Sequence, residues 1–600
     1  MQKEIKTNAM KHGATAVLLA IILTVVCFNF GIVPGSPLGS QPTSLPLKTF
    51  SSLEDLKSFL STNTDQMNTY GSMILYDRVG APTESGALDT YSTTNVQVAG
   101  VDESDIVKTD GTHLYVVSGA TVYILNAYPP SEAKVVSKIN LDETYGAEIY
   151  ISMNRLVIIG NSWPYLFREE VNSFIPYMGE VFVKVYDTSD LANPVLSRSV
   201  TINGTLTGSR MIGDYVYIVT SQPAVYPLMD QSDFEVSLPK ICMNGSVQAV
   251  NATEVRYVDV LDYYYQFTTV LSLNIQDDSE EPNHETFLAG SASCMYVSSE
   301  NLYLAIPNVA AWILADGENE VREETLIYRV NFEGRDMICE AQGAVLGSVL
   351  NQFSMDEYDG GFRIATTTWT SETSVSSLYI LDMNLTVVGR LEDIAPGERI
   401  YSARFMSSRC YLVTFEQVDP FFVIDVSDPA NPSILGYLKI PGFSGYLHPY
   451  DESHIIGLGC EDSSLKFSLF DVTDVSAPTE MAKYTVQGGW SDSSALWDHK
   501  AFLFDRSRRL LSIPVSIWTI ENETYWRDYW QGAYIFDISL EQGFTPKGTV
   551  THLDGADSYD WGYEVKRILF ISDVLYTVSD SLVQMHDMES LGFLNELKLS

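Results

Sequence analysis

One pattern of apolar and polar positions recurs along most of this chain of 600 residues. From about residue 95, a turn containing Asp, Asn, Ser or Gly leads into a mostly apolar run, and a segment of the form V-x-D follows. Runs of this length, rich in Val, Ile, Tyr and Phe and bounded by turn residues, predict β-strands in antiparallel sheets. The turn and its strand occur nine times: TDGTHLYVVSG (109–119), MNRLVIIG (153–160), GDYVYIVT (213–220), SENLYLAIP (299–307), DGGFRIATT (359–367), SSRCYLVTF (407–415), DESHIIGLG (451–459), DHKAFLFD (498–505) and SDVLYTVS (572–579).

The spacing of these units predicts one large β-propeller. The units lie mostly about 40–60 residues apart, which is room for four antiparallel strands whose two faces both need burial. Stacking such sheets around an axis buries the faces, and closing the ring protects the edges. Because propellers usually have about four to eight blades, either this ring is unusually large or the first and last units share one blade. We therefore expect an all-β propeller of eight or nine four-stranded blades over residues 95–600.

Residues 1–33 predict a cytoplasmic stub followed by a membrane anchor. The run ATAVLLAIILTVVCFNFGIV (14–33) carries no charge, and at about 1.5 Å per residue it is long enough to cross a bilayer. Lysines 3, 6 and 11 precede it, which places the N-terminus in the cytoplasm and the propeller outside the cell. A cleaved signal peptide, giving a secreted protein, is the alternative, because a Pro-Gly-Ser exit follows. The length of the run and the lack of an A-x-A site favour the uncleaved anchor.

Residues 34–94 predict a tether between this anchor and the propeller. The first part is rich in Pro, Ser, Gly and Thr, which is typical of a flexible connection. Ser52, with the acidic Asp55 three residues later, resembles the start of a helix. Apolar residues then follow at helical spacing: Leu53, Leu56, Phe59 and Leu60. One short amphipathic linker helix is therefore expected.

The chain is strongly acidic, with 36 basic and 77 acidic residues and a formal net charge of −41. Such a surface repels phosphate groups, so we expect no nucleic-acid partner. Sequons for N-glycosylation agree with an exterior glycoprotein and begin at Asn203, Asn244, Asn251, Asn384 and Asn522. Five cysteines follow the predicted anchor: Cys242, Cys294, Cys339, Cys410 and Cys460. Their odd number, without a C-x-x-C pair, argues against a disulfide framework or a thiolate zinc site, and leaves one disulfide open.

Several motifs are long enough to be compared with known families. They are YSARFMSSRCYLVTF (401–415), VDPFFVIDVSDPANPSILGYLKIPGFSGYLHPYDESHIIGLG (418–459), NVQVAGVDESDIVKTDGTHLYVV (95–117), DHKAFLF (498–504) and LYTVS (575–579). Together they resemble the secreted archaeal and bacterial β-propellers that are distantly related to WD repeats. The resemblance spans residues 95–600 and implies a propeller fold and an extracytoplasmic location. It implies no established activity and no catalytic residues.

A D-x-[ST]-D element recurs where the third strand of a unit turns into the fourth. It supplies three pairs of carboxylates: Asp187 and Asp190, Asp425 and Asp428, and Asp471 and Asp474. Paired carboxylates are ligands for Ca²⁺, which is the one cofactor that the sequence suggests. The same side chains also stabilise turns by accepting hydrogen bonds from nearby backbone N–H groups. A proline shortly after each pair favours the turn interpretation.

Five polar residues are candidates for a site at the mouth of the axial channel: Arg210, Arg404, His448, Asp498 and His499. Aligning the repeats puts Arg210, Arg404 and His448 at equivalent positions of innermost strands, which line the channel. Asp498-His499-Lys500 is expected in the turn between the first and second strands of its unit, where an aspartate is common but the other two residues are not needed. His552, with Asp554, Asp557 and Asp560, forms a second acidic candidate.

The segment 517–532 interrupts the eighth unit and is unusually aromatic for a connection between strands. Its aromatic residues are Trp518, Tyr525, Trp526, Tyr529 and Trp530. Exposed aromatic side chains in a long loop are typical of recognition surfaces, including those that stack on sugars. The alternative is a satellite core that fixes the loop to the propeller. Two further insertions, about 161–180 and 222–267, are expected to share a face with this segment.

These features predict a cell-surface binding or scaffold module whose rim loops contact a protein or glycan partner. The sequence carries no nucleophile elbow, zinc-protease helix, phosphate-binding loop or dinucleotide fingerprint. The alternative function is an extracytoplasmic hydrolase or lyase at the axial mouth. It requires Arg404, His448 and His499 to converge with carboxylates around an open pocket. A third possibility is an architectural envelope protein stabilised by Ca²⁺.

Overall fold

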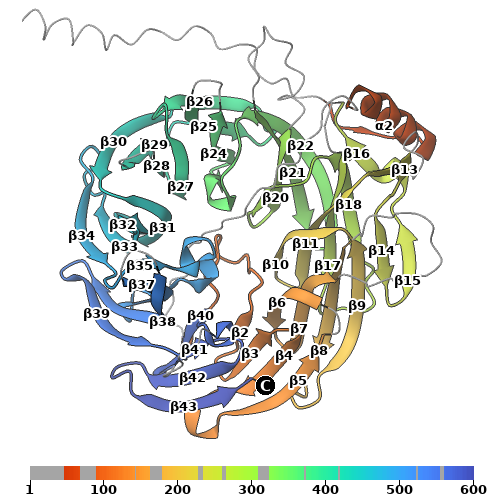
Figure 1. The fold of residues 1–600 in the computed structure, drawn as a ribbon. Coiled ribbons are helices and arrows are strands. Elements are labelled where there is room, and N and C mark those ends of the chain that lie inside the picture. Colours follow the sequence, from red (N-terminus) through yellow and green to blue (C-terminus); the bar gives the residue numbers. More distant parts are fainter. Residues whose placement is uncertain are drawn as a thin grey trace, which may run out of the picture. The chain divides into compact units, whose positions relative to one another are not determined.

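Nine antiparallel sheets are arranged radially around one axis in the computed structural model (Figure 1). The structure describes residues 46–67, 90–141, 144–162, 179–227, 234–259, 265–308, 323–369, 373–415, 419–521, 525–553 and 560–599. Each sheet has four core strands in chain order from the axis outward, with the innermost strand of blade 8 divided into two pieces. The predicted all-β propeller is therefore confirmed, and its ring has nine blades.

The first three blades contain the strands that follow the N-terminal segment, and two of them are extended at their outer edge. Blade 1 consists of β2 (Val107–Thr109), β3 (His113–Ser118), β4 (Thr121–Asn126) and β5 (Lys134–Asn140). Blade 2 consists of β6 (Thr144–Ser152), β7 (Arg155–Ser162), β8 (Glu180–Asp187) and β9 (Val195–Asn203), extended by β14 (Lys240–Met243) and β15 (Ser246–Ala249). Blade 3 consists of β10 (Thr205–Ile212), β11 (Tyr215–Pro223), β17 (Gln266–Asn274) and β18 (Asn283–Ala289), extended by β16 (Val255–Tyr257) and β1 (Lys48–Thr49).

Blades 4 to 6 are unextended four-stranded sheets. Blade 4 consists of β19 (Cys294–Val297), β20 (Asn301–Asn308), β21 (Glu324–Glu333) and β22 (Asp336–Leu346). Blade 5 consists of β23 (Met355–Tyr358), β24 (Gly361–Trp369), β25 (Ser374–Asp382) and β26 (Val387–Ile394). Blade 6 consists of β27 (Arg399–Met406), β28 (Arg409–Phe415), β29 (Asp419–Asp425) and β30 (Ser433–Ile440).

The last three blades include the one irregular sheet. Blade 7 consists of β31 (Phe443–Asp451), β32 (His454–Glu461), β33 (Ser464–Asp471) and β34 (Thr479–Thr485). Blade 8 consists of β35 (Trp490–Asp492) and β36 (Leu503–Asp505), which both pair with β37 (Leu510–Glu521), followed by β38 (Tyr525–Ser539) and β39 (Gly543–Val550). Blade 9 consists of β40 (Arg567–Ile571), β41 (Val574–Val578), β42 (Leu582–Asp587) and β43 (Phe593–Lys598).

A separate hydrophobic cluster fills each of the nine spaces between adjacent blades. The cluster between blades 1 and 9 includes Leu114, Tyr123, Leu569 and Tyr576. It closes the ring, because it joins the first sheet of the propeller to the last. Both sheets use only strands that are consecutive in sequence, so the first and last units do not share a blade. Tyr91 adds a single β-bridge to Ile571 at this junction.

The turns between third and fourth strands are packed against glycines of the preceding blade. A Cβ atom on Gly389 in β26 would lie 1.9 Å from the carbonyl oxygen of Pro429, so no larger residue fits there. The turn itself is held as predicted for D-x-[ST]-D: Asp425 accepts a hydrogen bond from the backbone N–H of Ser427 at 2.9 Å, and Asp428 accepts one from Ala430 at 3.0 Å. The other two elements show the same bonds, which confirms the turn interpretation. Within the described ranges, no group of three or more His, Cys, Asp or Glu residues is placed to hold a metal ion.

The predicted linker helix is present and packs against blade 3. It is α2 (Leu53–Met67), and the Ser52 side chain accepts a hydrogen bond from the backbone N–H of Asp55 at 3.1 Å, as its N-cap role predicts. Leu56 and Leu60 are fully buried in a cluster with the insertion between β11 and β17. That insertion also contains the hairpin β12 (Val225–Pro227) with β13 (Phe234–Val236) and the turn η2 (Ala252–Glu254). The N-terminal segment therefore attaches to the outside of the ring.

Two sequence predictions concern regions that the structure describes only in part. No helix of the described residues is long and apolar enough to cross a membrane. The predicted anchor, residues 14–33, and most of the insertion 161–180 lie outside the described residues.

Of the five cysteines that follow the predicted anchor, Cys339 and Cys410 are buried free thiols, and burial raises the pKa of Cys339 to about 12. These two behave as small hydrophobic residues of the core.

Candidate functional site: an axial network and an aromatic groove

A segment of the chain itself crosses the centre of the ring before blade 1 begins (Figure 1). We call residues 90–106 the axial segment. Asn95 donates hydrogen bonds to backbone carbonyls of blade 8, including that of Phe502 at 3.0 Å. Asp102 pairs with the backbone of Met211 in blade 3, and Asp105 pairs with Ile149 in blade 2. The segment therefore ties together blades that are far apart in the ring.

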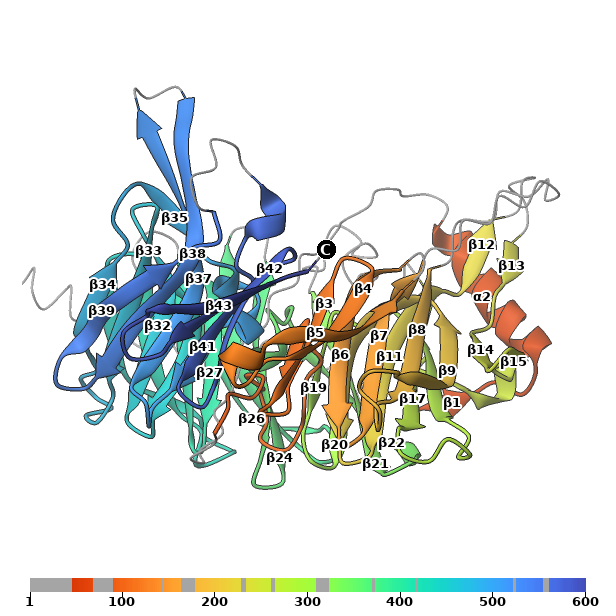
Figure 2. The same ribbon diagram turned by 90° about the horizontal axis from the view of Figure 1, so that it is seen from below.

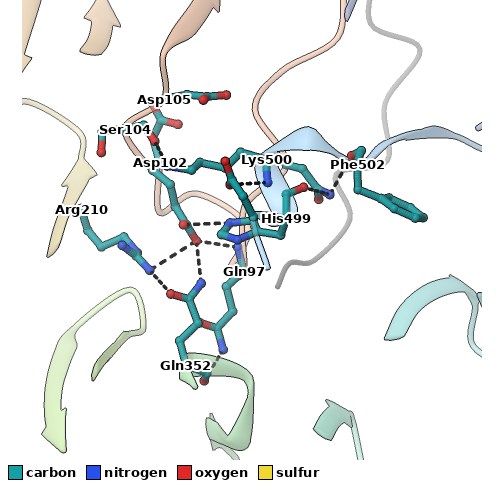
Figure 3. A network of polar contacts seen from close by, with 12 residues as sticks. Gln97, Asp102, Ser104, Asp105, Arg210, Gln352, His499, Lys500 and Phe502 are labelled. Carbon is teal, nitrogen blue, oxygen red and sulfur yellow. Dashed lines mark hydrogen bonds and ion pairs between the residues drawn. The ribbon is translucent and has the colours of Figure 1, made fainter. Parts of the chain in front are cut away.

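The carboxylate of Glu103 is the centre of the contacts that the axial segment makes. Figure 3 labels residues around it, among them Gln97, Arg210 and His499. It accepts hydrogen bonds from the backbone N–H of Gln97 and from Nε2 of His499, both at 3.0 Å. Arg210 lies 3.4 Å from the same carboxylate and donates to Oε1 of Gln352 at 2.9 Å. Glu103 is 4% exposed and His499 is also 4% exposed. This buried cluster joins the segment to blades 3 and 8 and to the loop before blade 5.

The surroundings of Glu103 keep it ionised despite its burial. Desolvation alone raises the pKa of a buried carboxyl group. Here Arg210 and His499 act against desolvation, and hydrogen bonds from His499 and from the backbone of Gln97 add to their effect. The result is a pKa for Glu103 well below its usual range. Glu103 is therefore an anion with a structural role, because its charge is balanced by groups of the chain itself.

A second buried ion cluster lies beside the first and is centred on Arg567 of β40. Its guanidinium group donates to Asp105 at 2.8 Å and to Asp498 at 2.5 Å. Desolvation acts to lower the pKa of Arg567, but the two carboxylates outweigh it and raise the pKa. Asp498 in turn has a pKa well below its usual range, because Arg567, Lys500 and His499 outweigh its desolvation. Lys500 completes the cluster through an ion pair with Glu148 of β6.

The innermost strand of blade 8 is interrupted to bring His499 and Lys500 to the axis. β35 and β36 pair with different parts of β37, and the residues between them form two short 3-10 turns, η4 (Ser494–Leu496) and η5 (His499–Ala501). Asp498 caps η5 by accepting the backbone N–H of Lys500 at 3.2 Å. The expected turn between first and second strands was therefore wrong for this unit: DHKAFLFD lies within the first strand, and the second strand is β37. The prediction failed because the interruption imitates the turn pattern of the other repeats.

Arg404 and His448 lie near this network but are buried among aromatic side chains. Both are 2% exposed. Arg404 lies over the ring of Phe353, 5.5 Å from its centroid, and the His499 ring contacts the same phenylalanine. His448 is bonded through Nδ1 to the Tyr446 hydroxyl at 2.8 Å, and its pKa is well below the usual value because of desolvation and the charge of Arg404. Arg404 and His448 are therefore part of the packed interior near the axis.

The network predicts that stability falls in acid. Glu103 and Asp498 have lower pKa values in the folded chain than in the unfolded one, so their contribution is complete above the unfolded pKa of about 4 and is lost as the pH falls below it. We expect the free energy of unfolding in urea to be similar at pH 7 and 5.5 and to drop steeply between pH 4.5 and 3. The Glu103→Gln variant should show a shallower drop. Equal acid sensitivity of the two proteins would contradict this assignment.

The aromatic segment of blade 8 is a continuation of two strands and not a loop. β37 and β38 pair over their whole length, from Leu510 with Asp537 to Glu521 with Tyr525, and the hairpin rises beyond the edge of the ring (Figure 2). The expectation of a loop over residues 517–532 was therefore wrong. Its aromatic and β-branched residues have the composition of a strand.

The alternation of side chains along these strands separates the aromatic residues into two groups. Successive side chains of a strand point to opposite faces of the sheet. Trp530 packs into the core between blades 7 and 8, together with Ile517. Trp490, Trp518 and Tyr529 form a row across three strands, with ring centroids 4.3 Å and 5.1 Å apart. The predicted satellite core is thus present on one face of the sheet, and the aromatic row lies on the other.

A polar row runs beside the aromatic row on the same face of blade 8. On each strand this row lies two residues away from the aromatic row: Asp492 pairs with Ser516, and Ser516 pairs with Gln531. Gln531 bonds to the backbone of Val565 in both directions, at 2.7 Å and 2.8 Å, and so joins blade 8 to blade 9. The Tyr529 hydroxyl donates to Glu564. Aromatic rings and hydrogen-bonding groups therefore alternate across one surface.

The polar row and two members of the aromatic row, Trp518 and Tyr529, line a cavity of about 480 Å³ between blades 8 and 9. We call it the hairpin groove. Trp497 and Trp561, which are 46% and 66% exposed, also line it, from the interruption in blade 8 and from η6 (Trp561–Tyr563). Asp498 and Arg567 of the second ion cluster belong to its lining as well. The groove thus combines exposed aromatic rings with polar residues that packing and ion pairs hold in place.

The structure places the predicted residues in different parts of this region. Arg210 and His499 meet at Glu103, and Asp498 lines the groove. Trp518 and Tyr529 also line the groove, whereas the side chains of Tyr525 and Trp526 lie outside the described part of the structure. The second acidic candidate falls mostly outside it too; His552 is buried between Ser579 and Thr577 hydroxyls.

Sequence reasoning missed the axial segment and several groove residues. Glu103 stands in VDESD, which carries no turn or repeat signal that separates it from other acidic residues. Arg567 was detectable, because it is two residues before the position aligned with Arg404 and thus on the same strand face. Trp561 follows the acidic stretch and Trp497 precedes Asp498, so both were visible as isolated aromatic residues in connections.

Comparisons with known proteins identify a family and two uncharacterized archaeal relatives. An uncharacterized protein of Archaeoglobus fulgidus is 28% identical, with 97% of this chain and 99% of that protein covered. An uncharacterized protein of Methanocaldococcus jannaschii is also 28% identical, with 97% and 96% covered. A eukaryotic initiation factor structure is 10% identical, covering 68% of this chain and 90% of its own, with a TM-score of 0.30. Residues 91–591 match the model of a family described as the β-propeller domain. The chain therefore belongs to the β-propeller domain family.

Proposed function

We propose that this protein is a cell-surface module that binds a glycan in the hairpin groove. The propeller fold suits a binding or scaffold role, because it presents rim residues on a rigid ring. The observation that carries the proposal is the aromatic row of Trp490, Trp518 and Tyr529 beside the polar row of Asp492, Ser516 and Gln531. The uncharged run 14–33, the lysines before it and the five sequons support a location outside the cell.

A glycan fits this groove better than a protein segment does. Sugar rings have one apolar face that stacks on aromatic rings and a rim of hydroxyl groups that need hydrogen-bond partners. The groove offers both kinds of contact within a few ångströms, and its volume of about 480 Å³ lies in the range of small-molecule sites. Gln531 is already fixed by its two bonds to Val565 of blade 9, so little of its side-chain entropy is lost when a ligand binds.

Removing the central aromatic ring tests the binding site. We expect Trp518→Ala to weaken glycan binding at least about tenfold, because tryptophan anchors in binding sites commonly contribute about 2 kcal/mol or more. Trp369→Ala is the matched control, since this tryptophan is 50% exposed at the end of β24 in blade 5, far from the groove in sequence and in the ring. Binding would be measured by calorimetry of the full chain in detergent against soluble oligosaccharides.

One outcome of this binding experiment would contradict the glycan assignment. If a panel of neutral and charged oligosaccharides gives no binding that Trp518→Ala abolishes, the glycan assignment is wrong.

The location is tested separately, by adding proteinase K to intact cells that express the full chain. Degradation of the propeller without lysis is expected. Complete protection until the cells are lysed would refute the surface location.

A further inference from the structure

We infer that the hairpin groove prefers an amino sugar, with its protonated amine bound at Asp492, over neutral and acidic sugars. This inference rests on the proposed function and adds the charge class of the ligand. It follows from the ion pairs of the groove: Lys566 and Arg567 are paired with other acidic groups, whereas Asp492 has no cationic partner among the described residues.

The position of Asp492 places its carboxylate next to the aromatic row. Asp492 pairs with Ser516 in the register of β35 with β37, two residues from the pair of Trp490 with Trp518. The two tryptophan rings are 4.3 Å apart, and the carboxylate follows on the same strand face. A sugar ring stacked on Trp518 would thus have one edge directed toward Asp492. An amine on that edge would meet a carboxylate, while the stacked ring covers the tryptophan.

The basic residues of the groove are committed to other acidic groups. Arg567 is bonded to Asp105 and Asp498, and Lys566 is paired with Asp580 at 2.6 Å. Neither cation forms an ion pair with Asp492, and no other lysine, arginine or histidine of the described ranges does so. The carboxylate accepts a hydrogen bond from the backbone N–H of Ser493 at 2.8 Å. A cationic ligand would therefore supply the missing counter-charge.

The other acidic side chains of the groove already have partners. Glu148 and Asp498 are paired with Lys500 and Arg567, and Glu564 accepts a hydrogen bond from the Tyr529 hydroxyl. Burial raises the pKa of Asp492, and an ammonium group beside it would lower that pKa again and be held by a charge-assisted hydrogen bond. The faces of the surrounding indole rings also attract cations. A uronic acid would instead bring a carboxylate close to Asp492 in a protein of net charge −41.

The test compares three tetrasaccharides of different charge, of which the first two share one sugar backbone. They are β-1,4-linked glucosamine, its fully N-acetylated form and α-1,4-linked galacturonic acid, titrated into the full chain in detergent at pH 6. We expect the free amine to bind about tenfold more tightly than the acetylated form, since charge-assisted hydrogen bonds are roughly twice as strong as neutral ones. The galacturonate should bind most weakly. Raising the pH to 8.5, where the sugar amine loses its proton, should reduce the difference to less than about threefold.

Two variants distinguish a specific contact from general attraction to an acidic protein. Asp492→Asn should abolish the preference for the free amine, so that the free and acetylated forms bind this variant within about twofold of each other. Glu589→Gln removes the same charge from an exposed side chain of blade 9 and should change nothing. If both variants reduce amine binding equally, the preference comes from net charge alone and the inference is wrong.

The failure of this inference is distinguishable from the failure of the proposed function. If the acetylated tetrasaccharide binds as tightly as the free amine, and Trp518→Ala abolishes both, the groove binds glycans but Asp492 does not select among them. If the galacturonate binds most tightly, the charge preference is opposite to the one inferred. If Trp518→Ala leaves all binding intact, the groove is not the site and both statements fall.

Discussion

Replacing Arg567 with methionine is expected to lower the free energy of unfolding by about 3–5 kcal/mol, the largest effect of any single substitution considered for this propeller. The change removes the shared counter-ion of Asp105 and Asp498 while keeping most of the side-chain volume. The buried carboxylate of Asp105 and the partly exposed one of Asp498 are then left close to each other without a guanidinium group between them. Urea unfolding at pH 7, followed by tryptophan fluorescence, measures the loss.

The control for this substitution is Arg506→Met, which removes a comparable ion pair at the surface. Arg506 is paired with Asp451 at 3.1 Å, but its side chain is 54% exposed, so we expect a loss below about 1 kcal/mol. Adding Asp498→Asn to Arg567→Met should recover part of the stability, because one uncompensated charge disappears. If Arg567→Met and Arg506→Met cost the same, the cluster at the axis is not the buried charge centre that the distances indicate.

The ring itself could be predicted from sequence because each blade repeats the same local rules. A turn followed by an apolar run marks the second strand in every blade but the eighth, and the D-x-[ST]-D turns fix where the third strand ends in blades 2, 6 and 7. Each blade meets mainly its neighbours, so a local pattern is sufficient to specify the architecture. Only blade 8 departs from the pattern, and there the assignment of Asp498 to a turn between strands failed.

The functional region depends on contacts between residues that are distant in sequence. Glu103 and His499 are separated by nearly four hundred positions and meet because the axial segment crosses the ring. No repeat pattern predicts that crossing, since the segment occurs once and lies before the first blade. The groove is different: Trp518 and Tyr529 were recognised from composition, but the face of the sheet that each occupies follows from strand register. That register became known only when 517–532 proved to be a hairpin.

The Glu103→Gln variant is expected to lose about 3 kcal/mol of stability, because it removes one partner from a buried charge cluster. Glutamine keeps the shape and an acceptor oxygen for the backbone N–H of Gln97, so the loss reports the charge more than the packing. Arg210 retains its bonds to Ser209 and Gln352, which is why the expected loss is smaller than for Arg567. Chemical unfolding at pH 7 gives the magnitude.

Hydrogen exchange shows whether Glu103 holds the axial segment specifically. In Glu103→Gln the backbone amides of Gln97, Asp102 and Asp105 should exchange faster, because each is protected by a contact of this segment with itself or a blade. The outer strands, which do not contact the segment, should keep their protection. Glu132→Gln, at an exposed position of the turn η1 (Pro130–Glu132), should change neither stability nor exchange. Uniformly faster exchange across all nine blades would mean that Glu103 contributes to the whole ring, and unchanged exchange of the segment would show that its position is fixed without this carboxylate.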